Sequence, residues 1–304
     1  MCTAEDWLHH CAEKMERAGV FFGHGTDNAH DEAAWMLLHV LRAPLDGSFE
    51  NWNIKLDDVQ AAELKDLLSR RIEERVPLAY LTGHARFCGL DFHVTRDSLV
   101  PRSPIAELII EQFSPWLNPH ARGRALDMCT GSACLAIAMA KYLPGFSIDA
   151  VDVSPKALQV AARNVARHEV DDQMRLIQSD LFAELQGKQY DLVVSNPPYV
   201  STEVFSKLPA EYLAEPFGAL VSGEDGLDIV LKILDASPSF MNPRGILVME
   251  VGESAETLIG LLPGVPFLWL EFEHGGDGVF LLGYDQLLAC HSDINKLLEQ
   301  RKHV

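Results

Sequence analysis

The hydrophobic positions of the first 75 residues recur with the period of a helix. Three amphipathic segments are predicted, and each follows a polar residue that can cap a helix: Thr3, Asp27 or Asp57. Their apolar faces carry Trp7, Cys11 and Met15, then Ala33, Leu37 and Val40, then Leu64, Leu67, Leu68 and Ile72. A basic face on the third segment is predicted to be solvated surface: Arg70, Arg71 and Arg75. We predict a small helical domain over residues 1–75, with no catalytic constellation.

Between residues 76 and 100 the pattern changes to that of strands. Pro77 ends the third helix. Residues 85–94 alternate between apolar and polar positions around Gly89, which predicts a β-hairpin. We assign residues 76–100 to a hairpin linker, after which residues 99–104 lead into a further helix.

From Arg124 onwards, short apolar runs alternate with helical segments, the rhythm of a parallel sheet with crossover helices. Strands are predicted at 125–128, 148–151, 176–177, 192–194 and 246–251, and helices at 135–142, after Ser154-Pro155 and at 227–234. The runs 267–272 and 279–282 flank a glycine-rich turn and are predicted to pair as an antiparallel edge. The fold class is therefore α/β, with a Rossmann-like domain over residues 101–304.

Composition narrows the class of protein. The chain has 304 residues, 48% of them hydrophobic, and a net charge of −19, whereas a protein that grips a phosphate backbone usually has the opposite sign. The acidity fits a basic protein partner, and it fits solubility alone equally well. Six cysteines include no CxxC pair and no zinc pattern with histidine, so no metal site is predicted and the thiols are expected to be reduced. With no signal-peptide pattern and no membrane-spanning run, a cytoplasmic location is expected.

The stretch that carries chemistry follows the fourth predicted strand. The apolar run stops at Asn196-Pro197-Pro198, because proline lacks an N–H donor and has a fixed φ. The chain therefore leaves the sheet at its carboxyl edge, where open α/β sheets bind ligands. The side-chain carbonyl of Asn196 and a proline carbonyl can accept both hydrogens of a planar –NH₂ group, and Tyr199 can cover its flat face. We predict a site for a neutral amide or an exocyclic amine, formed by Asn196, Pro197, Pro198 and Tyr199.

A polar turn is the alternative interpretation, since Asn and Pro are common where a strand ends. The pair Asn-Pro alone would favour it. The full sequence Asn-Pro-Pro-Tyr directly after Leu-Val-Val-Ser, with a glycine loop upstream, favours the binding site. These four residues resemble the signature of methyltransferases that act on planar nitrogen in proteins or in nucleic-acid bases.

A nucleotide-type site is predicted upstream. Gly131 lets the backbone of the turn after the first strand pass close to a ligand, and Asp152 at the tip of the second strand can accept both ribose hydroxyls. This pattern does not by itself separate a dinucleotide from S-adenosylmethionine. The absence of a full GxGxxG and the position of Asn196 favour the latter. Asp180, after the third strand, could accept from the adenine amine or simply cap a helix.

Together these residues resemble the N5-glutamine protein methyltransferases of the release-factor and ribosomal-protein type. The resemblance covers about residues 70–285 and includes 77–83, Phe87, 89–90, 100–102, 127–134, Asp152, 196–199, 215–216, Gly223, 226–227 and 275–280. Residues 101–108 resemble the branch that modifies a large-subunit ribosomal protein, because the release-factor branch usually has Thr-Glu soon after Pro-Arg. The resemblance implies that Asn196 and Pro197 hold the substrate amide and that the helical domain docks the substrate. It also implies that S-adenosylmethionine is lined by Cys129, Thr130, Gly131, Ser132, Ala133, Asp152 and Asn196.

Two positions depart from the wider superfamily pattern. Cys129 stands where glycine is usual, although in this branch cysteine looks typical. Ala133 also stands where glycine is usual, and if that position needs a positive φ, alanine costs about 1 kcal/mol. This departure concerns cofactor affinity and not the type of reaction.

Three alternatives remain open at the level of sequence. The same chemistry could act on peptide chain release factors. An adenine-N6 methyltransferase shares Asn-Pro-Pro-Tyr but would need a basic groove, which a net charge of −19 disfavours. A cofactor-binding assembly protein without activity is disfavoured by the intact Asn196. The expected partner is a basic ribosomal protein of the large subunit, with no direct nucleic-acid binding and no membrane.

Overall fold

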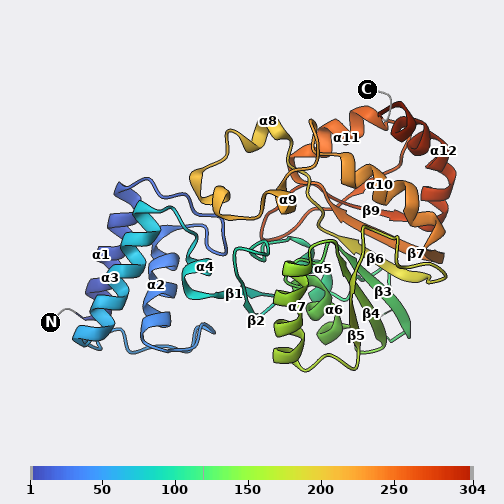
Figure 1. Cartoon of the computed structure of the whole chain (residues 1–304). Helices are drawn as coiled ribbons and strands as arrows, with labels where there is room; N and C mark the ends of the chain where they lie inside the picture. Colours follow the sequence, from blue (N-terminus) through green and yellow to red (C-terminus); the bar gives the residue numbers. More distant parts are fainter. Residues whose placement is uncertain (1–2, 119, 302–304) are drawn as a thin grey trace. The chain divides into compact units, whose positions relative to one another are not determined.

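The computed structural model describes residues 3–118 and 120–301 and divides the chain into two compact units (Figure 1). Unit 1 comprises the chain up to Arg96 and two later segments, Val100–Arg102 and Pro209–Glu215. We call these two segments returns, because the chain comes back to unit 1 there. Unit 2 comprises Asp97–Leu99, Ser103–Leu208 and the chain from Pro216 onwards. This division differs from the predicted ranges 1–75, 76–100 and 101–304, because the hairpin and the second return both belong to unit 1.

Unit 1 is a helical body with a hairpin. It contains α1 (Ala4–Arg17), α2 (Ala29–Val40), α3 (Asp58–Glu73), α4 (Leu78–Thr82), β1 (His84–Phe87), β2 (Leu90–His93) and a 3₁₀ helix (Ala210–Ala214). Thr3 and Asp57 cap α1 and α3 in capping boxes, as predicted. The prediction for α2 is wrong by one residue: Asn28 is the cap, because it has the extended backbone of an N-cap and accepts the N–H of Asp31.

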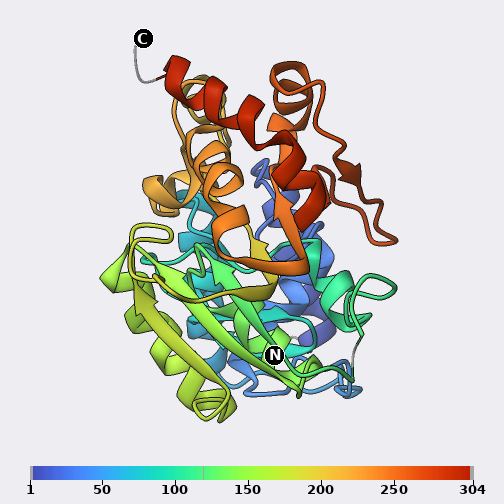
Figure 2. The ribbon, with the colours of Figure 1, turned by 90° about the vertical axis from the view of Figure 1, so that its right-hand side faces the viewer.

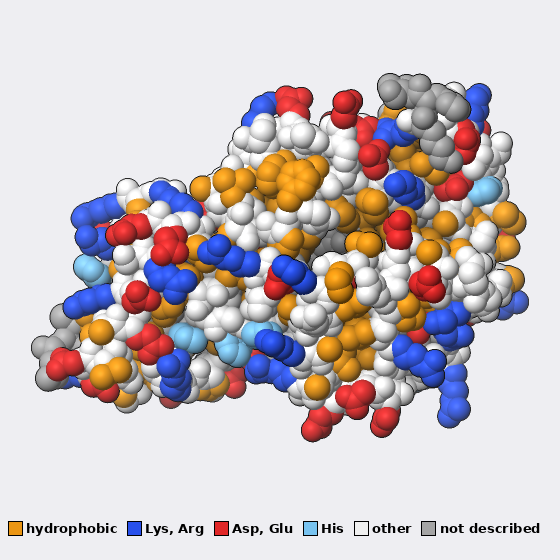
Figure 3. Space-filling model, viewed as in Figure 1, with side chains coloured by type: hydrophobic (Ala, Val, Ile, Leu, Met, Phe, Trp, Pro, Cys, Tyr) orange, Lys and Arg blue, Asp and Glu red, His pale blue; other side chains and the backbone are white. Residues whose placement is uncertain are grey.

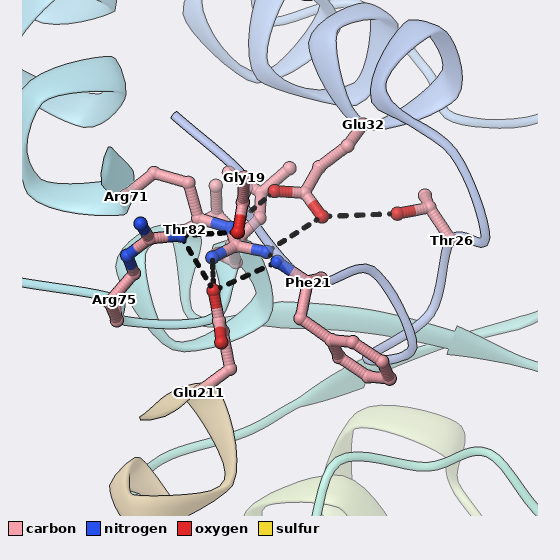
Figure 4. A network of polar contacts seen from close by, with 9 residues as sticks. Gly19, Phe21, Thr26, Glu32, Arg71, Arg75, Thr82 and Glu211 are labelled. Atoms are coloured by element: carbon pink, nitrogen blue, oxygen red, sulfur yellow. Dashed lines mark hydrogen bonds and ion pairs between the residues drawn. The ribbon is translucent and has the colours of Figure 1, made fainter. Parts of the chain in front are cut away.

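The prediction that Arg71 is solvated is also wrong. Its side chain is fully buried, and its guanidinium donates to Glu32, to the carbonyl oxygen of Phe21 and to Glu211 (Figure 4). These acceptors offset the cost of removing the guanidinium from water. Glu211 lies 140 residues further along the chain, so the network holds the return Pro209–Glu215 inside unit 1.

A second buried carboxylate, Glu215, lies at the end of the same return. Arg102 donates to both of its oxygens, at 2.8 and 2.7 Å, the N–H of Val100 donates at 3.1 Å, and His24 lies 3.4 Å away. Burial alone would raise the pKa of Glu215, but the neighbouring His24 and the charge of Arg102 outweigh it and hold the pKa at about 2. Glu215 is therefore ionised at neutral pH, and it ties the two returns together within unit 1.

Unit 2 is built on a seven-stranded sheet in the order β5-β4-β3-β6-β7-β9-β8. The strands are β3 (Gly123–Met128), β4 (Phe146–Asp152), β5 (Met174–Gln178), β6 (Tyr190–Ser195), β7 (Met241–Glu250), β8 (Leu268–Trp269) and β9 (Val279–Gly283). The first five are parallel, and β9 is antiparallel to both β7 and β8. Pairing of Leu268 with Leu281 confirms the predicted antiparallel edge.

Helices cover both faces of this sheet. The helices of unit 2 are α5 (Ile105–Ile110), α6 (Cys134–Tyr142), α7 (Pro155–His168), α8 (Thr202–Phe205), α9 (Phe217–Leu220), α10 (Asp228–Ala236), α11 (Ala255–Leu261) and α12 (Tyr284–Arg301), with 3₁₀ helices at Ser237–Ser239 and Gly252–Ser254. On one side of β3 the sheet continues with β4 and β5, which are reached through α6 and α7. On the other side β6 is followed by β7, which is reached through α10. Because such crossovers are right-handed, the two groups lie on opposite faces (Figure 2).

The C-terminal helix α12 extends the predicted architecture, since no element was predicted after residue 282. It buries Leu287 and Ile294 in the same core as α10 and β7. Among the described residues, none of the helices combines the length and the apolar composition needed to cross a membrane. The α/β prediction is thus confirmed, and the sheet reverses its direction of growth between β3 and β6.

Candidate active site

The reversal point between β3 and β6 brings the two predicted motifs together. The strands pair in parallel with Met128 opposite Ser195, so the turn 129–133 and the corner 196–199 leave the sheet side by side. The buried Ser195 hydroxyl donates to the carbonyl oxygen of Met128 at 2.8 Å and fixes the two strand ends to each other. In α/β sheets this is the position where ligands bind.

The turn after β3 is held in left-handed conformations. Cys129, Gly131 and Ala133 have φ of 64°, 56° and 63°. Ala133 is the N-cap residue of α6, and its left-handed backbone meets the condition for strain raised by its sequence. A Cβ on Gly131 would meet no atom within 4 Å, so open space adjoins the turn at this glycine.

Two carboxylates hold the turn by hydrogen bonds. Asp127 is fully buried, accepts from the Thr130 hydroxyl and from the N–H of Ala136, and burial raises its pKa to about 7. Asp152 accepts from the N–H groups of Gly131 and Ser154 at 2.9 and 2.8 Å, and burial raises its pKa above the ordinary value. These backbone hydrogen bonds fix the direction in which the Asp152 carboxylate points.

The residues present fit an adenosine-type cofactor. A carboxylate offers about four lone-pair sites, and on Asp152 the N–H groups of Gly131 and Ser154 each take one. The remaining ones suit a pair of ribose hydroxyls. Val153 and the exposed Asp180 border one open hollow of about 640 Å³ beside β5, which leaves Asp180 accessible to an amine. The side chain of Asp180 does not act as a helix cap here, since no helix begins at that position.

The polar groups of Asn196 are not used within the described fold. Its side chain is half-buried, and within the described part of the chain the carboxamide makes no hydrogen bond. No N–H of the described residues donates to the carbonyl oxygen of the neighbouring Pro197 either. Two acceptors are therefore available at adjacent positions, which is the arrangement that the sequence predicted for holding an –NH₂ group.

Tyr199 is held from several sides by residues that sequence reasoning missed. Its hydroxyl donates to Glu250 at 2.8 Å, and its carbonyl oxygen accepts from Ser254 at 2.7 Å. Its ring lies so close to Gly252 that a Cβ there would approach the ring Cε2 to 2.6 Å. The only sequence signal for these residues was a carboxylate at the end of the apolar run of β7, followed by glycine.

Comparison with known proteins agrees with this fold. Residues 6–83 match the model of the PrmC N-terminal domain, and residues 106–233 match that of the methyltransferase small domain. Among solved structures, the hMettl16 catalytic domain in complex with MAT2A 3'UTR hairpin 6 superposes with a TM-score of 0.53 at 18% identity, covering 81% of this chain and 91% of that chain. The same domain with hairpin 1 gives 0.50 at 17% identity, covering 82% and 88%. At such identity the likeness shows the fold alone.

Relatives over the full length are much closer in sequence. The ribosomal protein uL3 glutamine methyltransferase of Xanthomonas campestris pv. campestris is 46% identical over 299 residues, 98% of this chain and 97% of the relative. Those of Neisseria meningitidis serogroup A and Xylella fastidiosa are 47% and 45% identical, covering 95% and 98% of this chain and 95% and 96% of the relatives.

The fold, the matching family models and the full-length relatives define an S-adenosylmethionine-dependent methyltransferase. The full-length relatives narrow this class further. The chain belongs to the family of ribosomal protein uL3 glutamine methyltransferases. The resemblance to the ribosomal-protein branch is thereby confirmed, while the roles of individual site residues stay predictions.

Proposed function

We propose that this enzyme methylates the side-chain amide nitrogen (N5) of a glutamine in ribosomal protein uL3. The observation that carries the proposal is the pair of available acceptors at Asn196 and Pro197, beside the turn after β3. An amide is a neutral planar –NH₂ group, and two neutral acceptors match its two hydrogens. The names of the full-length relatives supply the identity of the substrate protein.

The residues of the chain would act mainly by orientation. When bound, S-adenosylmethionine would supply an electrophilic methyl group and would leave as S-adenosylhomocysteine once its S–CH₃ bond has broken. Asn196 and Pro197 accept the two amide hydrogens, which draws charge onto the nitrogen and aims it along the transfer direction. The Tyr199 ring covers the amide plane, and fixed dipoles stabilise the charge that develops. No strong general base is required, because the methylated amide readily loses a proton to water.

We propose that residues 1–75 dock the substrate protein, as their sequence predicts. The family model that matches residues 6–83 differs from the one that matches the catalytic part, which supports a separate role. On the face shown in Figure 3, Lys and Arg side chains lie among Asp and Glu and form no continuous basic surface. Together with the net charge of −19, this favours a basic protein over a nucleic acid as the partner.

A competition experiment tests the substrate. Unmodified uL3 and an unmodified release factor are offered together with labelled methyl donor, at low and high salt. We expect label on a uL3 glutamine, at a rate that falls as salt rises, because the Debye length shrinks from about 10 Å at 0.1 M. Label mainly on the release factor would overturn the substrate, and label on uL3 without salt dependence would remove the charge argument.

Substitution of Asp152 tests the cofactor site. In Asp152→Ala the dissociation constant for S-adenosylmethionine should rise. The expected loss of binding free energy is about 1.5–3 kcal/mol, the contribution of hydrogen bonds to a charged group. The matched variant Asp180→Ala removes an exposed carboxylate beside β5. Comparing the two variants separates binding of the ribose hydroxyls by Asp152 from binding of the adenine amine by Asp180. Calorimetric titration measures both constants. Unchanged affinity in Asp152→Ala would move the ribose site elsewhere.

A further inference from the structure

The carboxylate of Glu250 is an unusual feature of β7. The preceding residues 246–249 are all buried and apolar, and Glu250 itself is only 5% exposed. Its two oxygens accept from different hydroxyl groups, Oε1 from Tyr199 at 2.8 Å and Oε2 from Ser103 at 2.6 Å. A buried carboxylate destabilises a fold unless it is well hydrogen-bonded, and here both oxygens have a hydroxyl donor.

We propose that Glu250 is a positioning residue for methyl transfer, which acts by fixing the Tyr199 ring over the substrate amide. The inference rests on the proposed function, because it assigns a task to the corner that holds the amide. Glu250 meets no substrate atom in this role. Its carboxylate fixes the far end of the Tyr199 side chain, and the ring presents its face to the ligand.

The other contacts of Tyr199 show why one hydrogen bond is decisive. The backbone of Tyr199 is fixed by Ser254 and by Gly226, where a Cβ would come within 2.0 Å of the Tyr199 carbonyl oxygen. Gly252 limits the ring from one side. The hydroxyl bond to Glu250 holds the opposite end of the ring, so the ring is fixed at both ends of its long axis.

The orientation of the Tyr199 ring affects the rate because charge develops on the substrate nitrogen. As the new N–CH₃ bond forms, the amide nitrogen gains positive charge, and the face of an aromatic ring attracts a cation. A tyrosine whose hydroxyl donates to a carboxylate has a more electron-rich ring. A displaced ring would lose this attraction and the near-attack geometry together.

Ser103 is the second residue that donates a hydrogen bond to Glu250. Its hydroxyl oxygen also accepts the N–H of Ile105 at 3.2 Å, the first residue of α5. Glu250 thus connects the corner 196–199 with Ser103, a residue of the stretch 101–108 that resembles the ribosomal-protein branch. Ser103→Ala should lower the rate in the same direction as substitution of Glu250, but less, because the bond to Tyr199 remains.

A double-mutant cycle tests the inference. Tyr199→Phe and Glu250→Gln are each expected to lower kcat about 10- to 100-fold, the effect of a misplaced reacting group. If Glu250 acts through the Tyr199 hydroxyl, the double variant should be no slower than the slower single variant. Affinity for S-adenosylmethionine should be unchanged within experimental error. The control Glu253→Gln changes an exposed glutamate three residues further on and should match the wild type.

Each outcome has one meaning. Glu250→Gln keeps an acceptor and should retain more activity than Glu250→Leu, so a graded series supports positioning. Multiplied effects in the double variant, or a wild-type kcat in Glu250→Gln, would overturn the inference while the proposed function stands. A kcat loss matched by a loss of folded protein in thermal unfolding would assign Glu250 to stability alone, and this too overturns it. Wild-type enzyme that leaves glutamine unmodified would instead overturn the proposed function.

Discussion

Replacing Asn196 by alanine should lower the rate of methyl transfer by about 10²–10³-fold, the cost of losing one oriented hydrogen-bonding group at a reacting centre. The Asn196 carboxamide makes no hydrogen bond elsewhere in the described chain, so its removal breaks no hydrogen bond of the fold. Affinity for S-adenosylmethionine should fall only modestly, because Asp152 and the turn 129–133 remain. A methyl-transfer assay and calorimetry on one preparation measure both quantities.

Asn196→Asp is the matched control for this experiment. Aspartate keeps an acceptor oxygen at nearly the same place, replaces the –NH₂ donor by a second acceptor oxygen and adds a negative charge. If acceptance from the substrate amide is the task of Asn196, the aspartate variant should be faster than the alanine variant. An alanine variant that keeps more than about a tenth of the wild-type rate would contradict the role, given the effects usual for such groups.

The candidate site divides into parts that sequence could and could not predict. Asp152 and Asn196 follow directly from strand ends, because parallel strands place their carboxyl ends at one edge of a sheet. Glu250 could not be found in this way. Its two partners lie 51 and 147 residues away in the chain, and only the folded sheet brings them together.

Local patterns also decided which parts of the fold were predictable. The strands of unit 2 are short apolar runs bounded by turn residues, and they were identified because burial on both faces removes polar positions. The helix α12 was missed because only Leu287 and Ile294 are fully buried along its 18 residues, which leaves a weak pattern. For Ala133, the sequence analysis predicted backbone strain on the condition that φ is positive. The structure meets this condition with a φ of 63°.

Arg71 shows why charged positions mislead sequence reasoning. An arginine between Arg70 and Ile72 on an amphipathic helix carries no local sign of burial. Its acceptor Glu211 comes from a return of the chain 140 residues later, and such a partner is invisible to any local pattern. The same return carries Glu215, whose partners Val100 and Arg102 are likewise more than 100 residues away.

Replacing Arg71 by alanine should therefore destabilise unit 1 by about 3–5 kcal/mol, because the buried Glu32 loses its ionic partner and Glu211 keeps only the longer pair with Arg75 among the described residues. Glu32 and Glu211 are both almost fully buried, so neither carboxylate can turn to water without opening the helical body. Hydrogen exchange read by mass spectrometry resolves α2, α3 and residues 209–215 from the peptides of unit 2. We expect faster exchange in the first group and unchanged exchange in the sheet.

Two further variants separate charge from volume in this prediction. Arg70→Ala removes an arginine whose side chain is 42% exposed and whose acidic neighbours are surface pairs, so it should cost less than about 1 kcal/mol. The triple variant Arg71→Met, Glu32→Gln, Glu211→Gln removes all three charges and should recover part of the lost stability, because no buried charge is left unpaired. Protection in Arg71→Ala equal to that of the wild type would mean that the return is held by other contacts. A triple variant less stable than Arg71→Ala would show that the ion pairs themselves stabilise unit 1.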